Sequence, residues 1–263
     1  MKSLCGLRVL ITRPQAQANA LADAVIARGG DVLVHPMLRI EPLAREQASR
    51  SLQQRLDQRS IDAAVFISTN AVNHGVPVLR MVSESRRAAT ACYAIGSATA
   101  ARLGELGFEC AAGDAAMNSE TLLELESLQQ VEGKTIVIFK GEGGRPTLAR
   151  TLSERGATVI ESAVYRRLGP LIDAKSFCAE IDSAGVNVAL VGSGEALANL
   201  CGLLDPRHTG SMWMIVPSQR VADQAAELRC QHVRVAANAT DSAMLAALEE
   251  ASREILETTE MNS

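Results

Sequence analysis

The hydrophobic positions of this chain follow two alternating spacings. Short apolar runs such as "RVLI" (8–11) and "AAVF" (63–66) have the length of buried strands. The segment 15–30 instead repeats apolar residues at helical spacing and ends in glycine. Units of strand, turn and helix begin near residues 8, 63, 91, 134, 187 and 212. Strands that alternate with helices predict parallel sheets covered on both faces.

The units are also related to one another in sequence. Three pairs of segments match: "RGGDVLV" (28–34) with "RGATVIE" (155–161), "FISTNAV" (66–72) with "LVGSGEAL" (190–197), and "AIGSATAARL" (94–103) with "IVPSQRVADQ" (215–224). We therefore expect an internal repeat, in which one set of elements occurs twice.

Two domain organisations fit this repeat. A cut near residue 130 gives two contiguous halves, whereas a nested arrangement joins 1–37 to 172–263 and leaves 38–171 as the second domain. The stretches "MLRIEPLA" and "YRRLGPLID" combine proline with extended residues, as two strands crossing side by side between domains would. We favour nesting: two flavodoxin-like or Rossmann-like α/β domains, the second inserted into the first and joined to it by a two-stranded linker.

Composition narrows the classes of function. The chain has 263 residues, a net charge of −4, and only one Trp, two Tyr and four Phe. It therefore lacks the positive field and the stacking side chains that nucleic-acid binding needs. No apolar run approaches the roughly 18 residues of a membrane span, and the apolar N-terminal stretch lacks a cleavage site. We expect a cytoplasmic protein without a membrane contact.

The cysteines and histidines are scattered. The six cysteines form no C-x-x-C pair, and a chain of this size does not need disulfides, so we expect reduced and mostly buried thiols. None of the four histidines has a second histidine or a carboxylate at ligand spacing on one helix face. The sequence therefore predicts no metal site.

The stretch "TIVIFKGEGGRPTL" (135–148) predicts a strand, a glycine-rich turn and a helix. A dinucleotide-binding turn needs a third glycine where Pro146 stands. The "GKT" at 133–135 resembles the end of a P-loop but precedes its strand. These mismatches argue against nucleotide binding and disfavour a nucleotide-dependent transferase.

Small, hydroxyl or glycine residues follow each predicted strand just before a helix. One interpretation is helix N-capping, worth about 1 kcal/mol each. The other is anion binding, because parallel strands end at the ligand-binding edge of a sheet, where helix N-termini offer free N–H groups. Two domains that face each other would line a cleft with such sites. The residues expected to bind a polycarboxylate there are Thr12, Arg13, Ser68, Thr69, Asn70, Ser97, Thr99, Lys140, Gly141, Gly143, Arg145, Ser193, Gly194 and Ser218.

The ordered motifs resemble the uroporphyrinogen-III synthases. The resemblance runs through "VLITRP", "FISTNAV", "AIGSATAARLGELGF", "VIFKGEGGRPTLARTLSERGATVIESAVYRR" and "VRVAANATDSAMLAAL", and so covers nearly the whole chain. It implies two α/β domains, no cofactor, and cyclisation of hydroxymethylbilane, a linear tetrapyrrole with eight carboxylates, with inversion of ring D and loss of water. The resemblance also suggests a transient contact with the upstream hydroxymethylbilane synthase.

The resemblance implies a role for Tyr165 in "AVYRR" as well. This tyrosine matches one that the family places at its cleft, where the phenol could hydrogen-bond the leaving hydroxyl. The alternative is a linker tyrosine that covers the domain junction. The main rival function is a noncatalytic two-domain receptor that closes on a small anion.

Overall fold

The computed structural model describes residues 3–111, 118–144 and 146–261. The chain forms two compact units, one of Met1–Arg39 with Leu168–Ser263 and the other of Ile40–Arg167. The first unit is therefore built from both ends of the chain, and the second is inserted into it, as the nested arrangement predicts.

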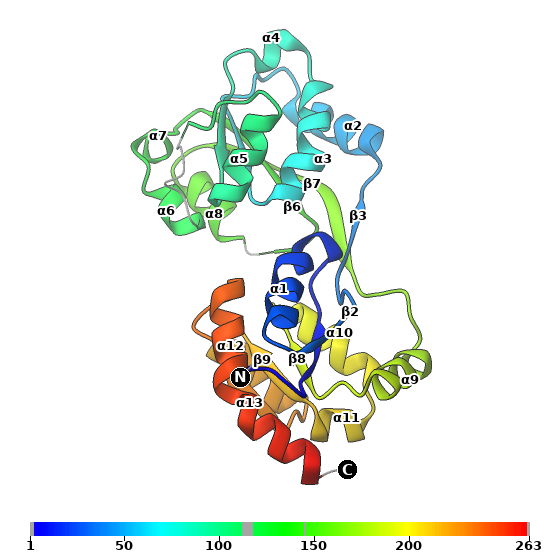
Figure 1. Cartoon of the computed structure of the whole chain (residues 1–263). Coiled ribbons are helices and arrows are strands. Elements are labelled where there is room, and N and C mark those ends of the chain that lie inside the picture. Colours follow the sequence, from blue (N-terminus) through cyan, green and yellow to red (C-terminus); the bar gives the residue numbers. More distant parts are fainter. Residues whose placement is uncertain (1–2, 112–117, 145, 262–263) are drawn as a thin grey trace. The chain divides into compact units, whose positions relative to one another are not determined.

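The first unit is a five-stranded sheet in the order β10-β9-β8-β1-β2. Its strands are β1 (Arg8–Ile11), β2 (Asp31–Val34), β8 (Val188–Leu190), β9 (Trp213–Val216) and β10 (His232–Val235). All four pairings are parallel, and Val9 of β1 lies opposite both Val32 of β2 and Val188 of β8. Figure 1 shows β1 in blue beside β8 in yellow, two segments far apart in the sequence.

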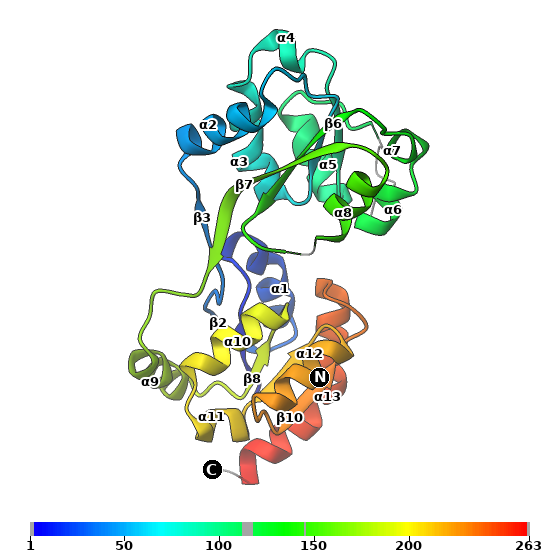
Figure 2. The ribbon, with the colours of Figure 1, turned by 180° about the vertical axis from the view of Figure 1, so that it is seen from behind.

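Helices cover both faces of this sheet (Figure 2). They are α1 (Gln15–Ala27), α9 (Ala174–Ala184), α10 (Gly194–Leu203), α11 (Pro206–Ser211), α12 (Gln219–Glu227) and α13 (Asp241–Met261). Alternate strand residues point to opposite faces. Val9 and Ile11 therefore pack under α1 and α13, whereas Leu10 packs under α9, α10 and α12.

The second unit is a five-stranded sheet in the order β3-β7-β6-β4-β5. Its strands are β3 (Arg39–Pro42), β4 (Ala63–Phe66), β5 (Ala91–Ala94), β6 (Thr135–Gly141) and β7 (Thr158–Leu168). Its helices are α2 (Arg45–Leu56), α3 (Thr69–Arg80), α4 (Glu84–Arg87), α5 (Ser97–Glu105), α6 (Ser119–Leu123), α7 (Glu126–Gln129) and α8 (Thr147–Glu154). The predicted linker stretches form β3 and β7, which are neighbours in this sheet.

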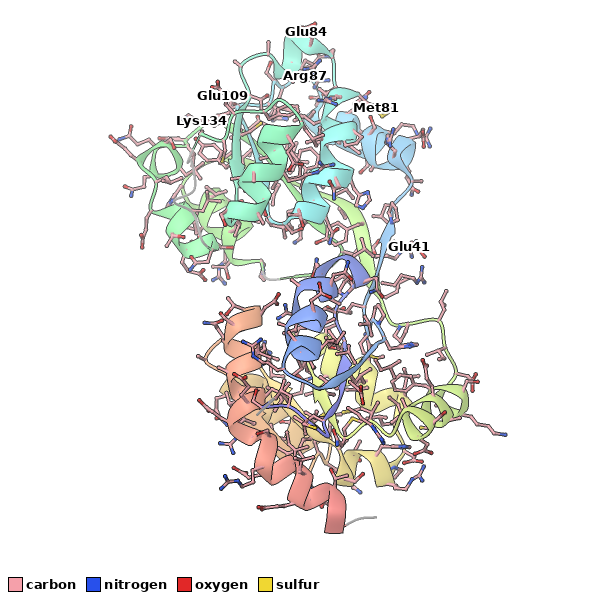
Figure 3. The ribbon with its side chains drawn as sticks, viewed as in Figure 1. Glu41, Met81, Glu84, Arg87, Glu109 and Lys134 are labelled. Carbon is pink, nitrogen blue, oxygen red and sulfur yellow. The ribbon has the colours of Figure 1, made fainter. Side chains whose placement is uncertain are left out.

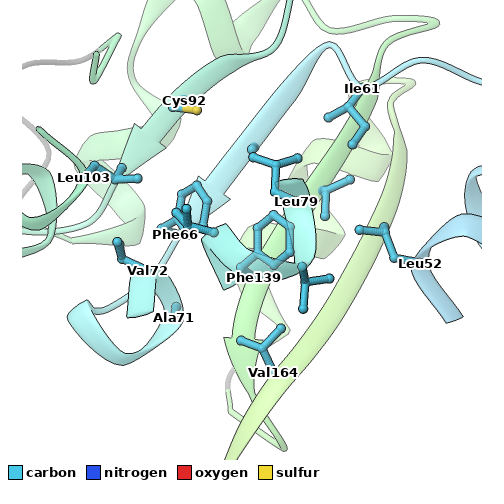
Figure 4. Close-up of a cluster of buried hydrophobic side chains, with 14 of the residues drawn as sticks. Leu52, Ile61, Phe66, Ala71, Val72, Leu79, Cys92, Leu103, Phe139 and Val164 are labelled. Atoms are coloured by element: carbon cyan, nitrogen blue, oxygen red, sulfur yellow. The ribbon is translucent and has the colours of Figure 1, made fainter. Parts of the chain in front are cut away.

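Two apolar layers hold the second sheet between its helices. On one face, the rings of Phe66 and Phe139 stack at 4.9 Å under α2, α3 and α5 (Figure 4). On the other face, Ile136 and Ile138 pack against α6, α7 and α8. The end of the unit where the strands begin carries side chains of both charges, among them Glu84 and Lys134 (Figure 3). That end therefore has no uniform charge.

The two sheets confirm the internal repeat. The order β9-β8-β1-β2 in the first unit corresponds to β5-β4-β6-β7 in the second. The equivalent of β10 is reduced to a single parallel bridge between Cys92 and Cys110. The helices correspond as well, because α9, α10 and α12 cover one face of the first sheet as α2, α3 and α5 cover one face of the second.

All six cysteines are unpaired in the structure, and only Cys92 and Cys230 are buried. The expectation that most of them lie in the core is therefore wrong. Among the described residues, no helix is both long and apolar enough to cross a bilayer.

Candidate functional site

The largest group of predicted residues that contact one another lies in the second unit and includes Ser68. Strand β4 ends two residues earlier, and Ser68 takes an extended conformation with φ −167° and ψ 164°. Its Oγ accepts the backbone N–H of Ala71 at 3.1 Å, so its predicted N-cap role is confirmed. The N–H groups of Thr69 and Asn70, in the first turn of α3, have no intrahelical acceptor. This helix start can therefore receive an anion.

The Ser68 hydroxyl also meets the Tyr165 phenol, with 3.1 Å between Oγ and Oη. Tyr165 is 3% exposed and belongs to β7. The register of β6 against β7 shifts at this point: Lys140 pairs with Ala163, but Gly141 pairs with Tyr165. The extra residue in β7 is a bulge, and it turns the tyrosine ring onto the sheet face that α3 covers.

Gly141 provides the space for this ring. The sequence suggested a residue of the glycine turn, but the structure makes Gly141 the last residue of β6. A Cβ on Gly141 would lie 2.7 Å from Tyr165 Cε2 and 2.8 Å from Cζ. Such distances are well inside an ordinary carbon–carbon contact of about 3.5 to 4 Å. The missing side chain is therefore what lets the phenol reach Ser68.

His74 of α3 lies near the tyrosine, with 6.2 Å between the ring centroids. Its pKa lies below the ordinary value of 6.5, first because burial removes water and second because Arg45 adds a positive charge nearby. His74 is therefore mostly neutral at pH 7 and adds no positive charge to this helix start.

The residues after β5 differ from the prediction. The N-cap of α5 is Gly96, with a φ of 84°, so Ser97 is the first helical residue and its side chain is exposed. Thr99 lies in the first turn and is 4% exposed. The hydroxyls of Ser97 and Thr99 are therefore not N-caps, although the backbone N–H groups of this first turn remain suitable for an anion.

Lys140 and the glycine turn do not join the tyrosine. Lys140 and Gly141 are successive strand residues, so their side chains leave the sheet on opposite faces. The Lys140 ammonium forms an ion pair with Glu161, and both residues line a cavity of about 330 Å³ beside α8. Gly143 has a φ of 73° and is exposed. Arg145 lies outside the described residues.

In the first unit, a cavity of about 340 Å³ collects Thr12, Arg13 and Ser193 where β1 and β8 end. Ser193 is the N-cap of α10 and accepts the Ala196 N–H at 3.2 Å, as predicted. Thr12 is 1% exposed and donates its hydroxyl to the Leu190 carbonyl at 2.9 Å. Its interpretation as an N-cap is therefore wrong: this hydroxyl joins two strands instead.

Arg13 is paired within its own unit. Its guanidinium contacts the Asp241 carboxylate and the Ala239 carbonyl. Because Arg13 and Lys140 each have a carboxylate partner, neither brings an uncompensated positive charge to an anion.

Gly194 and Ser218 complete the predicted set. Gly194 is buried, and its carbonyl accepts the Gln224 side-chain amide at 2.9 Å, so it serves the packing of α10 on α12. Ser218 occupies the N-cap position of α12 without a side-chain capping bond. The predicted set therefore divides into a Ser68–Tyr165–Gly141 group in one unit and a Thr12–Arg13–Ser193 group in the other.

Two features of the structure lie outside this set. A cavity of about 400 Å³ between α2 and β7 is lined by Arg55 and Arg166 among others, and contains none of the predicted residues. Arg166 directly follows Tyr165 in "AVYRR". This position beside the predicted tyrosine is the sequence signal that could have identified Arg166 as a candidate. In the first unit, Cys178, Asp205 and His208 form a group that could hold a metal ion.

The amino-acid sequence is similar to known uroporphyrinogen-III synthases. The family model described as "Uroporphyrinogen-III synthase HemD" matches residues 19–246. A uroporphyrinogen-III synthase of Salmonella typhimurium (strain LT2) is 33% identical, over 92% of this chain and 100% of its own length. One of Escherichia coli (strain K12) is 29% identical with the same coverage.

Solved structures show a similar fold. A uroporphyrinogen III synthase of the extremely thermophilic bacterium Thermus thermophilus superposes with a TM-score of 0.61 at 19% identity, covering 95% of this chain and 100% of that one. A uroporphyrinogen-III synthetase of Helicobacter pylori 26695 gives 0.62 at 15% identity, covering 91% and 97%. At these identities the likeness concerns the fold alone.

Proposed function

Because the chain belongs to the uroporphyrinogen-III synthase family, and so is a hydro-lyase of tetrapyrrole biosynthesis, we propose that its substrate is hydroxymethylbilane. In this reaction the linear tetrapyrrole loses water and closes with ring D inverted, which gives uroporphyrinogen III. The observation that carries our assignment of residues is the hydrogen bond between Ser68 and Tyr165.

Backbone donors bind the substrate carboxylates in this proposal. Arg13 and Lys140 are already paired with carboxylates, so the N–H groups at helix starts are the better docks. The first turn of α3 offers those of Thr69 and Asn70 in the second unit. The start of α10, after Ser193, opens into the cavity of the first unit. Side-chain identity at such docks matters little.

The chemistry requires little from the protein. The C–O bond of the terminal hydroxymethyl group breaks, the oxygen leaves as water after gaining a proton, and an electron-deficient azafulvene remains. The substituted carbon of ring D then attacks it and forms a spiro intermediate. The bond from that carbon to its original methylene bridge breaks, and the freed methylene bonds to the other α-carbon of ring D, which loses a proton. The pyrroles supply the electrons. The enzyme's main task is to hold the chain so that this closure outruns the simple closure in solution.

Tyr165 assists the departure of the hydroxyl. Ser68 Oγ has one proton, and a lone pair of the same oxygen accepts the Ala71 N–H. When Ser68 donates its proton to Tyr165 Oη, the phenol keeps its own proton for the leaving oxygen. Ser68 thus positions the acid while it caps α3.

The test is the Tyr165→Phe variant, assayed for steady-state turnover of freshly made hydroxymethylbilane. General acid catalysis typically contributes about 10²- to 10⁴-fold, and water can partly replace the phenol, so we expect turnover to fall without being abolished. The matched control is Tyr93→Phe. Tyr93 is also buried, at 4% exposed, and donates its hydroxyl to Ser127 Oγ at 2.9 Å. Equal losses in both variants would reject the role of Tyr165.

Product analysis separates this function from the rival receptor. The enzyme yields the type III isomer, whereas a receptor that only binds the anion would leave the spontaneous type I product. We further propose a cytoplasmic location and a transient contact with hydroxymethylbilane synthase, because a substrate that closes spontaneously benefits from direct delivery.

A further inference from the structure

A group of metal-ligating side chains lies in the first unit, where β8 and β9 begin. Cys178 lies on α9, Asp205 is the N-cap of α11, and His208 lies on α11. One ligand atom from each residue lies within 4.8 Å of those of the other two. The parallel strands of this sheet end near Thr12 and Ser193, so this group lies at the opposite edge from those residues.

His208 carries the strongest indication of a ligand. It is 5% exposed, and its Nε2 lies 3.0 Å from Asp182 Oδ1. Of the two imidazole tautomers, the one that donates its Nε2–H to Asp182 leaves Nδ1 as a metal-binding lone pair.

That lone pair faces the proposed site. Nδ1 is buried and lies 2.7 Å from Asp205 Oδ1. Either a proton on Nδ1 or a metal ion can join these two atoms. Cys178 Sγ adds a third donor, and its present contact is a weak hydrogen bond to the Leu203 carbonyl at 3.3 Å.

We propose that Cys178, Asp205 and His208 bind a divalent cation of the zinc type, and that Asp182 holds His208 in the required tautomer. Thiolate, imidazole and carboxylate together suit zinc, commonly as three protein ligands with water in the fourth position. A carboxylate that accepts the other imidazole N–H is the usual outer partner of a metal-bound histidine. Cys178 and Asp182 share a face of α9, being four residues apart.

Geometry and charge both permit this ion. Tetrahedral zinc ligands lie roughly 3.3 to 3.5 Å apart, so the three atoms need to move by about 1 Å. The Cys178 thiolate, Asp205 and Asp182 bring three negative charges and Arg207, which contacts Asp182 at 2.9 Å, brings one positive charge. The remaining charge matches that of one divalent ion. A cavity of about 430 Å³, lined by Cys178, Asp182 and Asp205, gives it access.

The sequence suggested no metal because His208 looked isolated, and that premise is wrong. The ligands come from two short local pairs, Cys178 with Asp182 and Asp205 with His208, and the fold brings these pairs together. A bound ion would join α9 to α11 and so stabilise this edge of the unit.

The first test is zinc titration of the chelator-stripped full chain against a chromogenic chelator. We expect one zinc ion per chain and at least a tenfold loss of affinity in Cys178→Ala. The control is Cys5→Ala, which removes an exposed thiol. No stoichiometric binding, or equal losses in both variants, would show that His208 holds only a proton or that zinc binding is adventitious, and would overturn the proposal.

A second pair of variants protects the test against misfolding. Asp205→Ser keeps an N-cap oxygen for the His208 N–H while removing the carboxylate ligand. Asp173→Ser makes the same change at the N-cap of α9, away from the ligands. With cobalt(II), the wild type and Asp173→Ser should show a thiolate-to-metal charge-transfer band that Asp205→Ser loses. A band of equal strength in all three proteins, or in none, would refute the site.

Discussion

Replacing Gly141 with alanine tests how the tyrosine is held. The new Cβ would lie 2.7 Å from Tyr165 Cε2 and 3.2 Å from Oη. The ring must therefore retreat by about 1 Å to restore ordinary contact. Because Ser68 Oγ and Tyr165 Oη are 3.1 Å apart, a shift of that size stretches their hydrogen bond beyond a useful length.

The expected cost follows from these contacts. Overpacking costs about 1 to 3 kcal/mol, and the lost hydrogen bond adds about 0.5 to 1.5 kcal/mol. Removing a glycine returns about 0.4 to 1 kcal/mol through the unfolded chain. We expect Gly141→Ala to lower the free energy of unfolding by about 0.5 to 4 kcal/mol, measured by urea denaturation. Turnover should fall at least as far as in Tyr165→Phe.

Two comparisons isolate the cause. Gly133→Ala places a side chain at a φ of 74° with nothing within 4 Å, so it should cost about 1 kcal/mol of backbone strain and leave turnover unchanged. In a Tyr165→Ala background the ring is gone, and most of the cost of Gly141→Ala should disappear. A Gly141→Ala protein with unchanged stability and turnover would refute the proposed arrangement.

The remaining predictions concern packing, capping and pH. Gly75→Ala should destabilise the protein by about 1 to 3 kcal/mol in the urea assay, because its Cβ would lie 2.8 Å from a phenylalanine ring of β6. Gly104→Ala lies on α5, and its Cβ would meet nothing within 4 Å, so this change should instead stabilise by about 0.5 to 1 kcal/mol. Ser193→Ala should cost about 1 kcal/mol of stability through its lost cap and reduce turnover only mildly, whereas Ser68→Ala should reduce turnover clearly because it also releases the tyrosine. Because the pKa of His74 is lowered in the folded protein, the unfolded chain binds a proton at this residue just below pH 6.5, whereas the folded protein does not. Stability should therefore fall as the pH drops from 6.5 towards the folded pKa, and His74→Asn should weaken this dependence in melts recorded across that range.

Local sequence predicted the elements and their repetition, because hydrophobic spacing and helix stops act over short distances. The match of 28–34 with 155–161 identified β2 and β7 as equivalents. Each lies beside the equivalent strand, β1 or β6, although β7 also has β3 on its other side. Proline and extended residues in the two linker stretches favoured the nested arrangement, which the strand order confirms.

The use of individual side chains was less predictable, because it depends on partners from distant segments. Thr12 and Ser68 both follow a buried strand, yet one hydroxyl bonds a neighbouring strand and the other caps a helix. Gly141 looked like part of a turn. Its role, to leave space for the Tyr165 ring, depends on a bulge in β7, a strand farther along the chain. By contrast, Asp205 before Pro206 is a readable local signal for the start of α11.

The nested connectivity has a consequence for biosynthesis. Val9 lies in a central strand, and its partner Val188 leaves the ribosome long after it. At about 5 to 20 residues per second, the wait is about 10 to 40 s. The inserted unit is complete before then, so it can fold first. Until β8 emerges, β1 lacks the partner strand on one of its two sides. Chaperone capture during translation should therefore centre on this early segment, and its release should coincide with the emergence of β8.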